Sequence, residues 1–369
     1  ERFTRIKHDS NFPSNAIQFC VDQAGINADQ IEAIAFYEKP FLKFERLLET
    51  YLAFAPKGFK SFSKAMPLWV KDKLFQKLTL INALDKTFGI KGDWENRLLF
   101  SEHHLSHAAS AFYPSPFKRA AILTMDGVGE WATSSLAIGE GNKIHIEKEM
   151  HFPHSLGLLY SAFTSYTGFR VNSGEYKLMG LAPYGEPKYI NIIKERLIDI
   201  KADGSFRLNM EYFNYCTELT MTNDKFHKLF DGDPRRSESD ISQKEMDIAA
   251  SIQKITEEVI IKLGKDILFT SGQENLCLAG GVALNCVANG ALLKQNIFKN
   301  IWIQPAAGDA GGAIGAALSI HYLMNGSDRK LEKGKDSMQG SYLGPEYKNN
   351  DIEQSLGILG ASFQKLSDD

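Results

Sequence analysis

Hydrophobic and polar residues follow two different periods along the chain, and these periods predict its helices and strands. Residues 245–268 predict a long amphipathic helix, because hydrophobic side chains recur at spacings of three and four, at Met246, Ala249, Ile252, Ile255, Val259 and Leu263. Short hydrophobic runs predict buried strands in AAILTM (120–125), NLCLA (275–279) and NIWI (300–303). Each of these runs leads into a loop that contains glycine, so strands, glycine loops and helices alternate.

Weaker patterns complete the expected order of elements. They predict a helix over 14–26 with Ser14 as its candidate N-cap and Gly25 near its end, strands over 31–38 and 97–102, a helix that stops at Pro114, and a β-hairpin over 134–150. We expect residues 151–240 to be mostly irregular, since glycines and tyrosines interrupt any clear period. The chain from about residue 326 is polar.

Residues 41–90 differ from the rest, because they are aromatic, rich in lysine and helical in period. We interpret them as a helical insertion. Basic aromatic stretches also bind nucleic acid, but an amphipathic packing face explains this one better. The remaining strands and helices predict an α/β fold whose ligand loops lie at the strand ends.

The composition narrows the classes of function. The 369 residues carry a net charge of -3 and are 43% hydrophobic, so no excess of positive charge points to nucleic acid. No run reaches the roughly 18 apolar residues of a membrane helix. Four cysteines form no CxxC pair, which favours free thiols in a reducing compartment. We therefore expect a cytoplasmic protein that binds neither nucleic acid nor membrane.

The stretch SEHHLSHAASAF (101–112) offers the first candidate chemistry. His103 and His107 are four residues apart, which stacks their side chains on one helix face, whereas His104 lies about 100° round the helix. Two imidazoles at this spacing can hold a metal, but histidines of a hydrophobic core show the same spacing. The zinc-protease motif requires glutamate where His104 stands. The pair alone leaves both interpretations open.

Two aspartates follow predicted strands. Asp126 precedes Gly127 and Gly129, whose backbone N–H groups can approach a phosphate, although a plain tight turn explains these residues equally well. Asp309 lies in PAAGDAGGAIGAA (305–317), where close helix packing explains the small residues but not the aspartate.

Two more segments add candidate anion-binding groups. Gly280 and Gly281 in AGGVALN (279–285) precede a helix, which is weak support for a nucleotide site. Lys177, in SGEYKLMGLAPYG (173–185), either binds a phosphate or is a surface lysine. Together the loops predict a metal held by two imidazoles and one or two carboxylates beside a nucleotide cleft. Iron(II), manganese and zinc suit such ligands.

These segments, in this order, resemble the nodulation-type and antibiotic-type O-carbamoyltransferases. The resemblance is carried by ERFTRIKHD (1–9), EHHLSHAASAF, MDGVGEW (125–131), SGEYKLMGLAPYG, LAGGVALNC (278–286) and PAAGDAGGAIGAA. More distantly, the chain is similar to the tRNA threonylcarbamoyl-transfer enzymes. The resemblance implies an α/β, actin-like ATPase fold, that is, a duplicated ribonuclease-H-like fold, with a helical insertion at about 41–90.

The resemblance also implies roles for individual residues. An iron(II)-type metal would be held by His103, His107, Asp126 and Asp309, and the catalytic residues would be Asp126, Lys177 and Asp309. The adenylate would lie against Gly127, Gly129, Gly157, Gly280, Gly281, Asn285 and Gly308. The general base is left open among His8, His104 and His154.

The implied reaction belongs to biosynthesis. In the family, carbamoyl phosphate and ATP give carbamoyl-adenylate, and its carbamoyl group then passes to a hydroxyl of a sugar or antibiotic. The expected partners are therefore carbamoyl phosphate, ATP, a hydroxyl-bearing small molecule and, in a homodimer, a second copy of the chain.

The chain departs from the family pattern at both ends. The family has a β-hairpin before ERFTR and a C-terminal domain that forms carbamoyl-adenylate. We expect residues 1–330 to be the transfer domain without that hairpin, and 331–369 to be a linker towards the absent domain. Such a fragment would bind metal without forming carbamoyl-adenylate unaided; rapid ATP consumption that depends on carbamoyl phosphate would contradict this.

Two other functions compete with carbamoyl transfer. A nucleotide-binding actin-like ATPase module without transfer chemistry would use the glycine loops but would give the two histidines no role. A structural or interaction protein would dock through residues 41–90.

Overall fold

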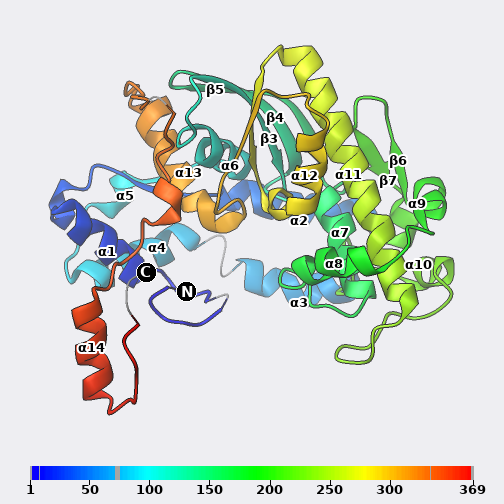
Figure 1. The fold of residues 1–369 in the computed structure, drawn as a ribbon, viewed down its shortest axis with the longest axis horizontal. Helices are drawn as coiled ribbons and strands as arrows, with labels where there is room; N and C mark the ends of the chain where they lie inside the picture. Colours follow the sequence, from blue (N-terminus) through cyan, green and yellow to red (C-terminus); the bar gives the residue numbers. More distant parts are fainter. Residues whose placement is uncertain (1, 8, 71–74, 333, 367–369) are drawn as a thin grey trace.

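The structure is a computed structural model that describes residues 2–7, 9–70, 75–332 and 334–366. Its centre is a five-stranded mixed sheet formed by β3 (Arg119–Met125), β4 (Ala132–Glu140), β5 (Lys143–His151), β8 (Asn275–Ala279) and β9 (Asn300–Ile303). The order across the sheet is β5-β4-β3-β8-β9 (Figure 1). β4 is antiparallel to both neighbours, whereas β3, β8 and β9 are parallel. The predicted α/β class and the predicted β-hairpin are confirmed.

Parallel pairing brings the carboxyl ends of β3, β8 and β9 to one edge of the sheet. Leu123 pairs with Leu278, and Leu278 pairs with Ile303. The loops that follow the three strands therefore leave the sheet beside one another. In open α/β sheets this edge is where ligands bind, and here it carries Asp126 and Asp309.

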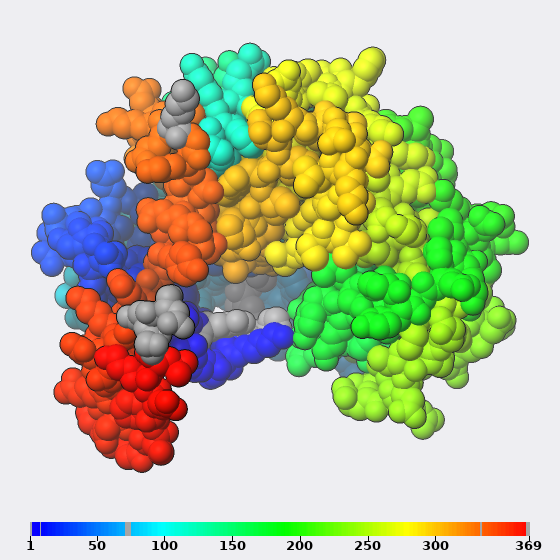
Figure 2. Space-filling model, in the orientation of Figure 1, coloured from blue at the N-terminus to red at the C-terminus, as the bar shows by residue number. Residues whose placement is uncertain are grey.

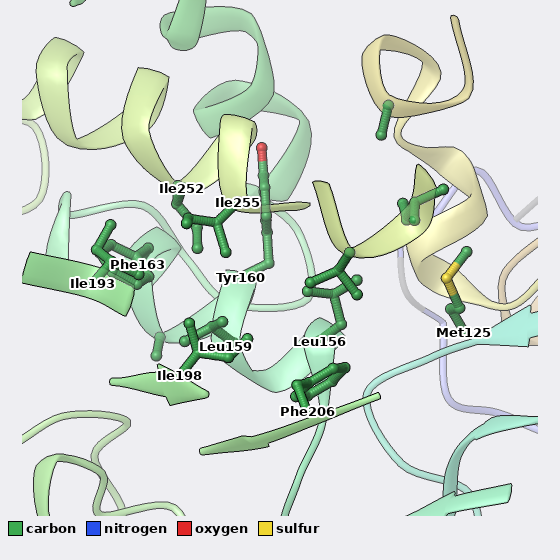
Figure 3. Close-up of a cluster of buried hydrophobic side chains, with 14 of the residues drawn as sticks. Met125, Leu156, Leu159, Tyr160, Phe163, Ile193, Ile198, Phe206, Ile252 and Ile255 are labelled. Atoms are coloured by element: carbon green, nitrogen blue, oxygen red, sulfur yellow. The ribbon is translucent and has the colours of Figure 1, made fainter. Parts of the chain in front are cut away.

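Alternate residues of β3 face two separate hydrophobic cores. Leu123 and Met125 belong to the larger core, to which α7 (Leu156–Tyr166) and α11 (Gln243–Ser271) contribute bulky side chains (Figure 3). Ala120 and Ile122 belong to the smaller core, to which α6 (His103–Phe112) contributes mainly alanines. Because strand side chains alternate between the faces, one strand serves both cores.

The glycines of α13 (Gly312–Ser319) explain how closely it packs on α6. A Cβ atom built on Gly315 would lie 1.7 Å from the backbone oxygen of Ser106. Only glycine fits there, so close packing accounts for the small residues that follow Asp309.

Residues 41–90 are helical, as predicted, and form α2 (Pro40–Phe54), α3 (Phe59–Trp69) and α4 (Gln76–Phe88); residues 71–74 of the predicted range lie outside the described residues. We keep the name helical insertion for this segment. It runs from β1 (Ile34–Phe36) to α5 (Trp94–Arg97) and β2 (Leu98–Phe100). β1 and β2 pair in parallel and are shorter than the predicted strands.

The expectation that residues 151–240 are mostly irregular holds only in part, because several helices and strands interrupt the turns and loops of this segment. Besides α7, the segment forms α8 (Glu175–Leu181), α9 (Ile190–Arg196), β6 (Ile198–Ile200), β7 (Phe206–Leu208) and α10 (Asp224–Leu229). These elements are short and lie against the larger core, where Phe226 and Phe230 are fully buried. The elements do follow their periods, since buried Ile193 and Leu197 are four residues apart and buried Phe206 and Leu208 flank exposed Arg207, but each element is too short for its pattern to stand out in the sequence.

Two further details differ from the expected order of elements, one at the start of α1 and one in the polar C-terminal part. Ser14 is the first residue of α1 (Ser14–Ala24) and does not cap it, whereas Gly25 ends that helix in the left-handed conformation, as predicted. The polar C-terminal part carries α14 (Asn349–Ile358), none of whose residues is buried. This segment forms the red projection at the lower left of Figure 2. Among the described residues, no helix is long and apolar enough to cross a membrane.

Candidate metal centre

Four side chains from three segments meet at the carboxyl edge of the sheet. His103 and His107 lie one turn apart on α6, with their Nε2 atoms 3.0 Å apart. Asp126 directly follows β3, and its Oδ2 lies 2.9 Å from His103 Nε2 and 3.3 Å from His107 Nε2. Asp309 follows β9, and its Oδ1 lies 3.5 and 3.6 Å from the same two nitrogens. The structure thus gathers all four predicted ligands.

This group has the size and the chemistry of a metal site. One ligand atom from each residue lies within 4.8 Å of the other three. Bonds of about 2.1 Å place opposite ligands of one cation about 4.2 Å apart, so small side-chain shifts suffice to hold it. Two imidazole nitrogens and two carboxylate oxygens suit iron(II), manganese or zinc. The side chain of Asp309 is 60% exposed, whereas those of His103 and His107 are buried, so the group opens to solvent on the Asp309 side.

The side chains of the centre share strong electrostatic interactions. Burial opposes a charge on His103, but hydrogen bonds with Asp126 and Asp309 outweigh it and raise its pKa to about 10. The same contacts raise the pKa of His107 against the effect of burial. Burial also favours neutral carboxyls, yet the histidines hold the pKa of Asp126 well below its usual range and lower that of Asp309 to about 2. Both carboxylates therefore stay negative at neutral pH and attract a cation.

In the part of the chain that the structure describes, the Nδ1 atoms of the two imidazoles have no hydrogen-bond partner. Both atoms, of His103 and of His107, are buried. Metal-bound histidines usually donate this N–H to a carboxylate or carbonyl group. Here the ring of Tyr37 lies 5.6 Å from that of His103, centroid to centroid. The directions of the imidazoles therefore depend on packing and on the position of α6.

The backbone around Asp126 is held by its neighbours. The N–H of Gly281 donates to Asp126 Oδ1 at 3.1 Å. The hydroxyl of Ser155, the N-cap of α7, donates to the carbonyls of Asp126 and Gly127. A Cβ atom on Gly157 would lie 2.6 Å from the carbonyl oxygen of Asp126. These contacts fix the aspartate at the end of β3.

Among the other predicted nucleotide-binding residues, three are explained by local packing. Gly280 has φ +89°, and a Cβ there would lie 2.2 Å from the Met125 oxygen. A Cβ on Gly129 would lie 3.0 Å from atoms of His103 and His104. Asn285 caps α12 (Cys286–Lys294) and exchanges hydrogen bonds with Gln253.

Gly127 and Gly308 remain more open. The nearest atom to a Cβ built on either glycine is a leucine methyl group at 4.0 and 3.7 Å, respectively. The space beside these two glycines is therefore open next to the ligand group, since Gly127 follows Asp126 and Gly308 precedes Asp309 in the chain.

The other predicted site residues are not part of the ligand group. Lys177 is exposed on α8, and within the described residues its side chain has no hydrogen bond or ion pair. His104 points away from the group: its Nδ1 lies 2.7 Å from Thr124 Oγ1, and burial together with the neighbouring histidines lowers its pKa to about 3. Its burial and its lowered pKa argue against His104 as the general base. His154 Nδ1 accepts from the N–H of Leu208, and His8 lies outside the described residues.

Two residues that support the centre carry only weak sequence signals. Glu130, in the MDGVGEW segment, is 7% exposed and accepts hydrogen bonds from the N–H of His103. Arg46 on α2 is 6% exposed and donates to the carbonyl of Gly129 at 3.0 Å. Arg46 is the only arginine among the basic residues of 41–90, which was the available hint that it differs from the surface lysines.

The five-stranded mixed sheet and the histidine–aspartate group at its carboxyl edge define an α/β domain with a candidate metal site. Comparison with known proteins identifies its family. The carbamoyltransferase N-terminus family matches residues 1–318. An uncharacterised protein of Synechocystis is 62% identical over the whole chain and 59% of its own length. Nodulation protein NolNO of Sinorhizobium fredii is 33% identical over 99% of the chain and 49% of its own length.

A solved structure shows weaker likeness. The crystal structure of HypF from T. kodakarensis aligns with 68% of this chain and 39% of its own, at 13% identity and a TM-score of 0.35, and no conclusion rests on it. The family match shows that the chain belongs to the carbamoyltransferase family, to its N-terminal part. The chain spans about half the length of the curated relatives it matches.

Proposed function

We propose that the protein transfers a carbamoyl group from carbamoyl-adenylate, made from carbamoyl phosphate and ATP, to a hydroxyl of a sugar or another small-molecule acceptor. The observation that carries this proposal is the meeting of His103, His107, Asp126 and Asp309 at the carboxyl edge of the sheet, in a chain of the carbamoyltransferase family. An ATPase module without transfer chemistry leaves this group without a role.

The four residues would hold a divalent metal, with iron(II) the first candidate. Such a cation, when bound, polarises a carbonyl oxygen and stabilises the charge that develops there. His103 and His107 would contribute imidazole nitrogens from the buried side once the cation displaces their protons, and Asp126 and Asp309 would contribute two negative charges. Asp309 lies on the open side, so substrates would approach past it.

The transfer step needs orientation more than activation. The acceptor oxygen forms a bond to the carbamoyl carbon, and the bond between that carbon and the phosphate oxygen breaks. AMP leaves with the electron pair, and the hydroxyl proton passes to a base or to solvent. Backbone N–H groups at Gly127 and Gly308, which are the open glycines beside the centre, would receive the phosphate of the adenylate. Gly280 and Gly281 would position Asp126 from behind.

The strand order supports the proposed actin-like fold. Numbered along the chain, the five strands lie in the order 3-2-1-4-5, with the second antiparallel to the others. This is the arrangement of one ribonuclease-H-like half. The short parallel pair β1–β2 would belong to the other half, so that α6 lies between the two.

The proposal is tested with chemically prepared carbamoyl-adenylate, a set of sugar acceptors and iron(II), with the carbamoylated product measured by mass spectrometry. We expect product with the wild type and none with Asp309→Asn, because the exposed ligand loses its charge. Lys177→Met tests the predicted phosphate contact against Lys228→Met, which changes another exposed lysine, on α10. Product formation by Asp309→Asn at the wild-type rate contradicts the proposal.

A further inference from the structure

The first turn of the histidine helix is fixed by a residue distant in sequence. His103 is the first residue of α6, and the preceding residue, Glu102, makes no side-chain cap. Instead, both carboxylate oxygens of Glu130 accept from the N–H of His103, at 3.2 and 3.0 Å. A negative charge at a helix N-terminus also interacts favourably with the helix dipole. Glu130 therefore takes the place of the missing cap.

The same carboxylate ties the helical insertion to the centre. Glu130 Oε1 accepts from the N–H of Lys39, immediately before α2, at 2.7 Å. One helical turn and a half into α2, the guanidinium of Arg46 donates to Gly129 and lies 5.2 Å from the centroid of the Phe152 ring. Arg46 and Glu130 are both buried, where their opposite charges attract.

This arrangement matters because the imidazoles lack outer partners. Within the described residues, Nδ1 of His103 and of His107 is unpaired, so each ring forms hydrogen bonds only through Nε2, the atom that would bind the metal. A shift of the first turn of α6 therefore moves His103 Nε2 relative to Asp126. Gly129 packs closely on His103, since a Cβ added to it would lie 3.0 Å from His103 Cβ, and this contact couples the loop to the same turn.

We propose that Glu130 is a positioning residue of the metal centre, and that Arg46 of the helical insertion locks the loop that carries it. The inference rests on the metal centre of the proposed function. It assigns the insertion a role: through Lys39 and Arg46, α2 sets the distance between the histidine helix and Asp126.

The opposite end of α6 offers a matched control. Arg329 donates hydrogen bonds to the carbonyls of Phe112, Tyr113, Ser115 and Phe117, so it stabilises the C-terminus of the same helix. The end of α6 that Arg329 contacts, at Phe112, lies more than one turn beyond His107. Removing Arg329 should destabilise α6 without moving its first turn.

The experiment compares Glu130→Ala, Arg46→Met, Arg46→Lys and Arg329→Met. Cobalt(II) is the probe: its affinity is measured by titration and its coordination by visible absorption. Thermal unfolding of the metal-free proteins measures stability, and hydrogen exchange of the amides in the first turn of α6 measures the position of the helix.

Losing a residue that orients ligands typically lowers metal affinity 10- to 100-fold, and we expect this for Glu130→Ala and Arg46→Met, with an altered cobalt spectrum and faster exchange of the first turn. Arg46→Lys should restore most of the affinity, because it keeps a charged donor. Arg329→Met should lower the unfolding temperature but leave affinity and spectrum near those of the wild type.

Two results would overturn the inference. One is cobalt affinity of Glu130→Ala equal to that of the wild type; the other is an equal loss in Arg329→Met, which would show a general effect of helix stability. If the wild type binds no cobalt, the proposed centre fails instead, and hydrogen exchange alone decides whether Glu130 holds the first turn: unchanged exchange in Glu130→Ala then overturns its role.

Discussion

The two faces of the central sheet are built from different kinds of residue. On one face, Leu123 and Met125 belong to the core that contains leucines and Phe163 of α7 and isoleucines of α11; Figure 3 labels Met125, Phe163, Ile252 and Ile255 of this core. On the other face, Ala120 belongs to the smaller core, in which Ala108, Ala109 and Ala111 of α6 are fully buried. Large side chains bury more apolar area and contribute more to stability, whereas small ones let backbones approach closely.

The difference separates stability from ligand placement. The alanines of α6 let this helix lie close to the sheet. Gly315 lets α13 lie equally close to α6, because any side chain at this position would overlap the Ser106 backbone. The histidine side chains of α6 therefore lie buried close to the ends of the strands. We expect changes on the bulky face to affect folding alone, and changes on the small-residue face to affect metal binding as well.

The largest expected loss of stability comes from Phe163→Ala on the bulky face. Phe163 is fully buried and its ring packs edge-on against those of Phe226 and Phe230. Phenylalanine-to-alanine changes in cores cost about 3–5 kcal/mol. Chemical unfolding measures the loss, and cobalt titration of the remaining folded protein should give the wild-type affinity. A weaker affinity would show that the two faces are coupled.

Gly315→Ala should have a smaller effect on stability but a specific effect on the centre. The added methyl group meets the Ser106 backbone, between the two ligand histidines, and overpacking of this kind costs about 1–3 kcal/mol. We expect cobalt affinity to fall with stability. Gly290→Ala, in α12, is the control, because no atom lies within 4 Å of the added Cβ. If Gly315→Ala and Gly290→Ala had the same stability and the same cobalt affinity, close packing between α13 and α6 would not explain the glycine at position 315.

The smallest expected effect lies at Asp247 on α11. Burial favours its neutral form, but hydrogen bonds from Lys188, Glu186 and Gln243 outweigh burial and lower its pKa. A depressed folded pKa adds stability that is present above the unfolded pKa of about 3.9 and is lost as pH falls through the folded value. Asp247→Asn should therefore flatten the fall in unfolding temperature below about pH 4. Unchanged acid sensitivity would contradict this, and affinity for cobalt at neutral pH should not change.

The ligand group was predictable from the sequence because its parts are local. His103 and His107 follow a helical spacing, and Asp126 and Asp309 follow hydrophobic runs that form the parallel strands β3 and β9, on either side of β8. Their convergence needs only the rule that the ends of such strands meet at one edge. The strand and helix periods were equally clear for β3, β8, β9 and α11.

The parts that the sequence did not predict depend on contacts between distant segments. Glu130 caps a helix that begins 27 residues earlier in the chain, and no local cap pattern indicates it. Being the one arginine of residues 41–90 sets Arg46 apart in the sequence, but its role follows from its burial and from its hydrogen bond to the carbonyl of Gly129. Likewise, Gly280 looks like a nucleotide loop but is required by its close approach to Met125, a constraint that only the fold reveals.

The central claim is that four side chains from three segments bind one divalent cation. Equilibrium binding of iron(II) or cobalt(II) to wild type, His107→Ala and Asp126→Asn, with metal content measured by plasma mass spectrometry, tests it most directly. We predict one cation per chain in the wild type and loss of that cation in both variants, with Lys228→Met binding as the wild type does. A wild-type protein that binds no cation, or variants that keep theirs, would contradict the claim.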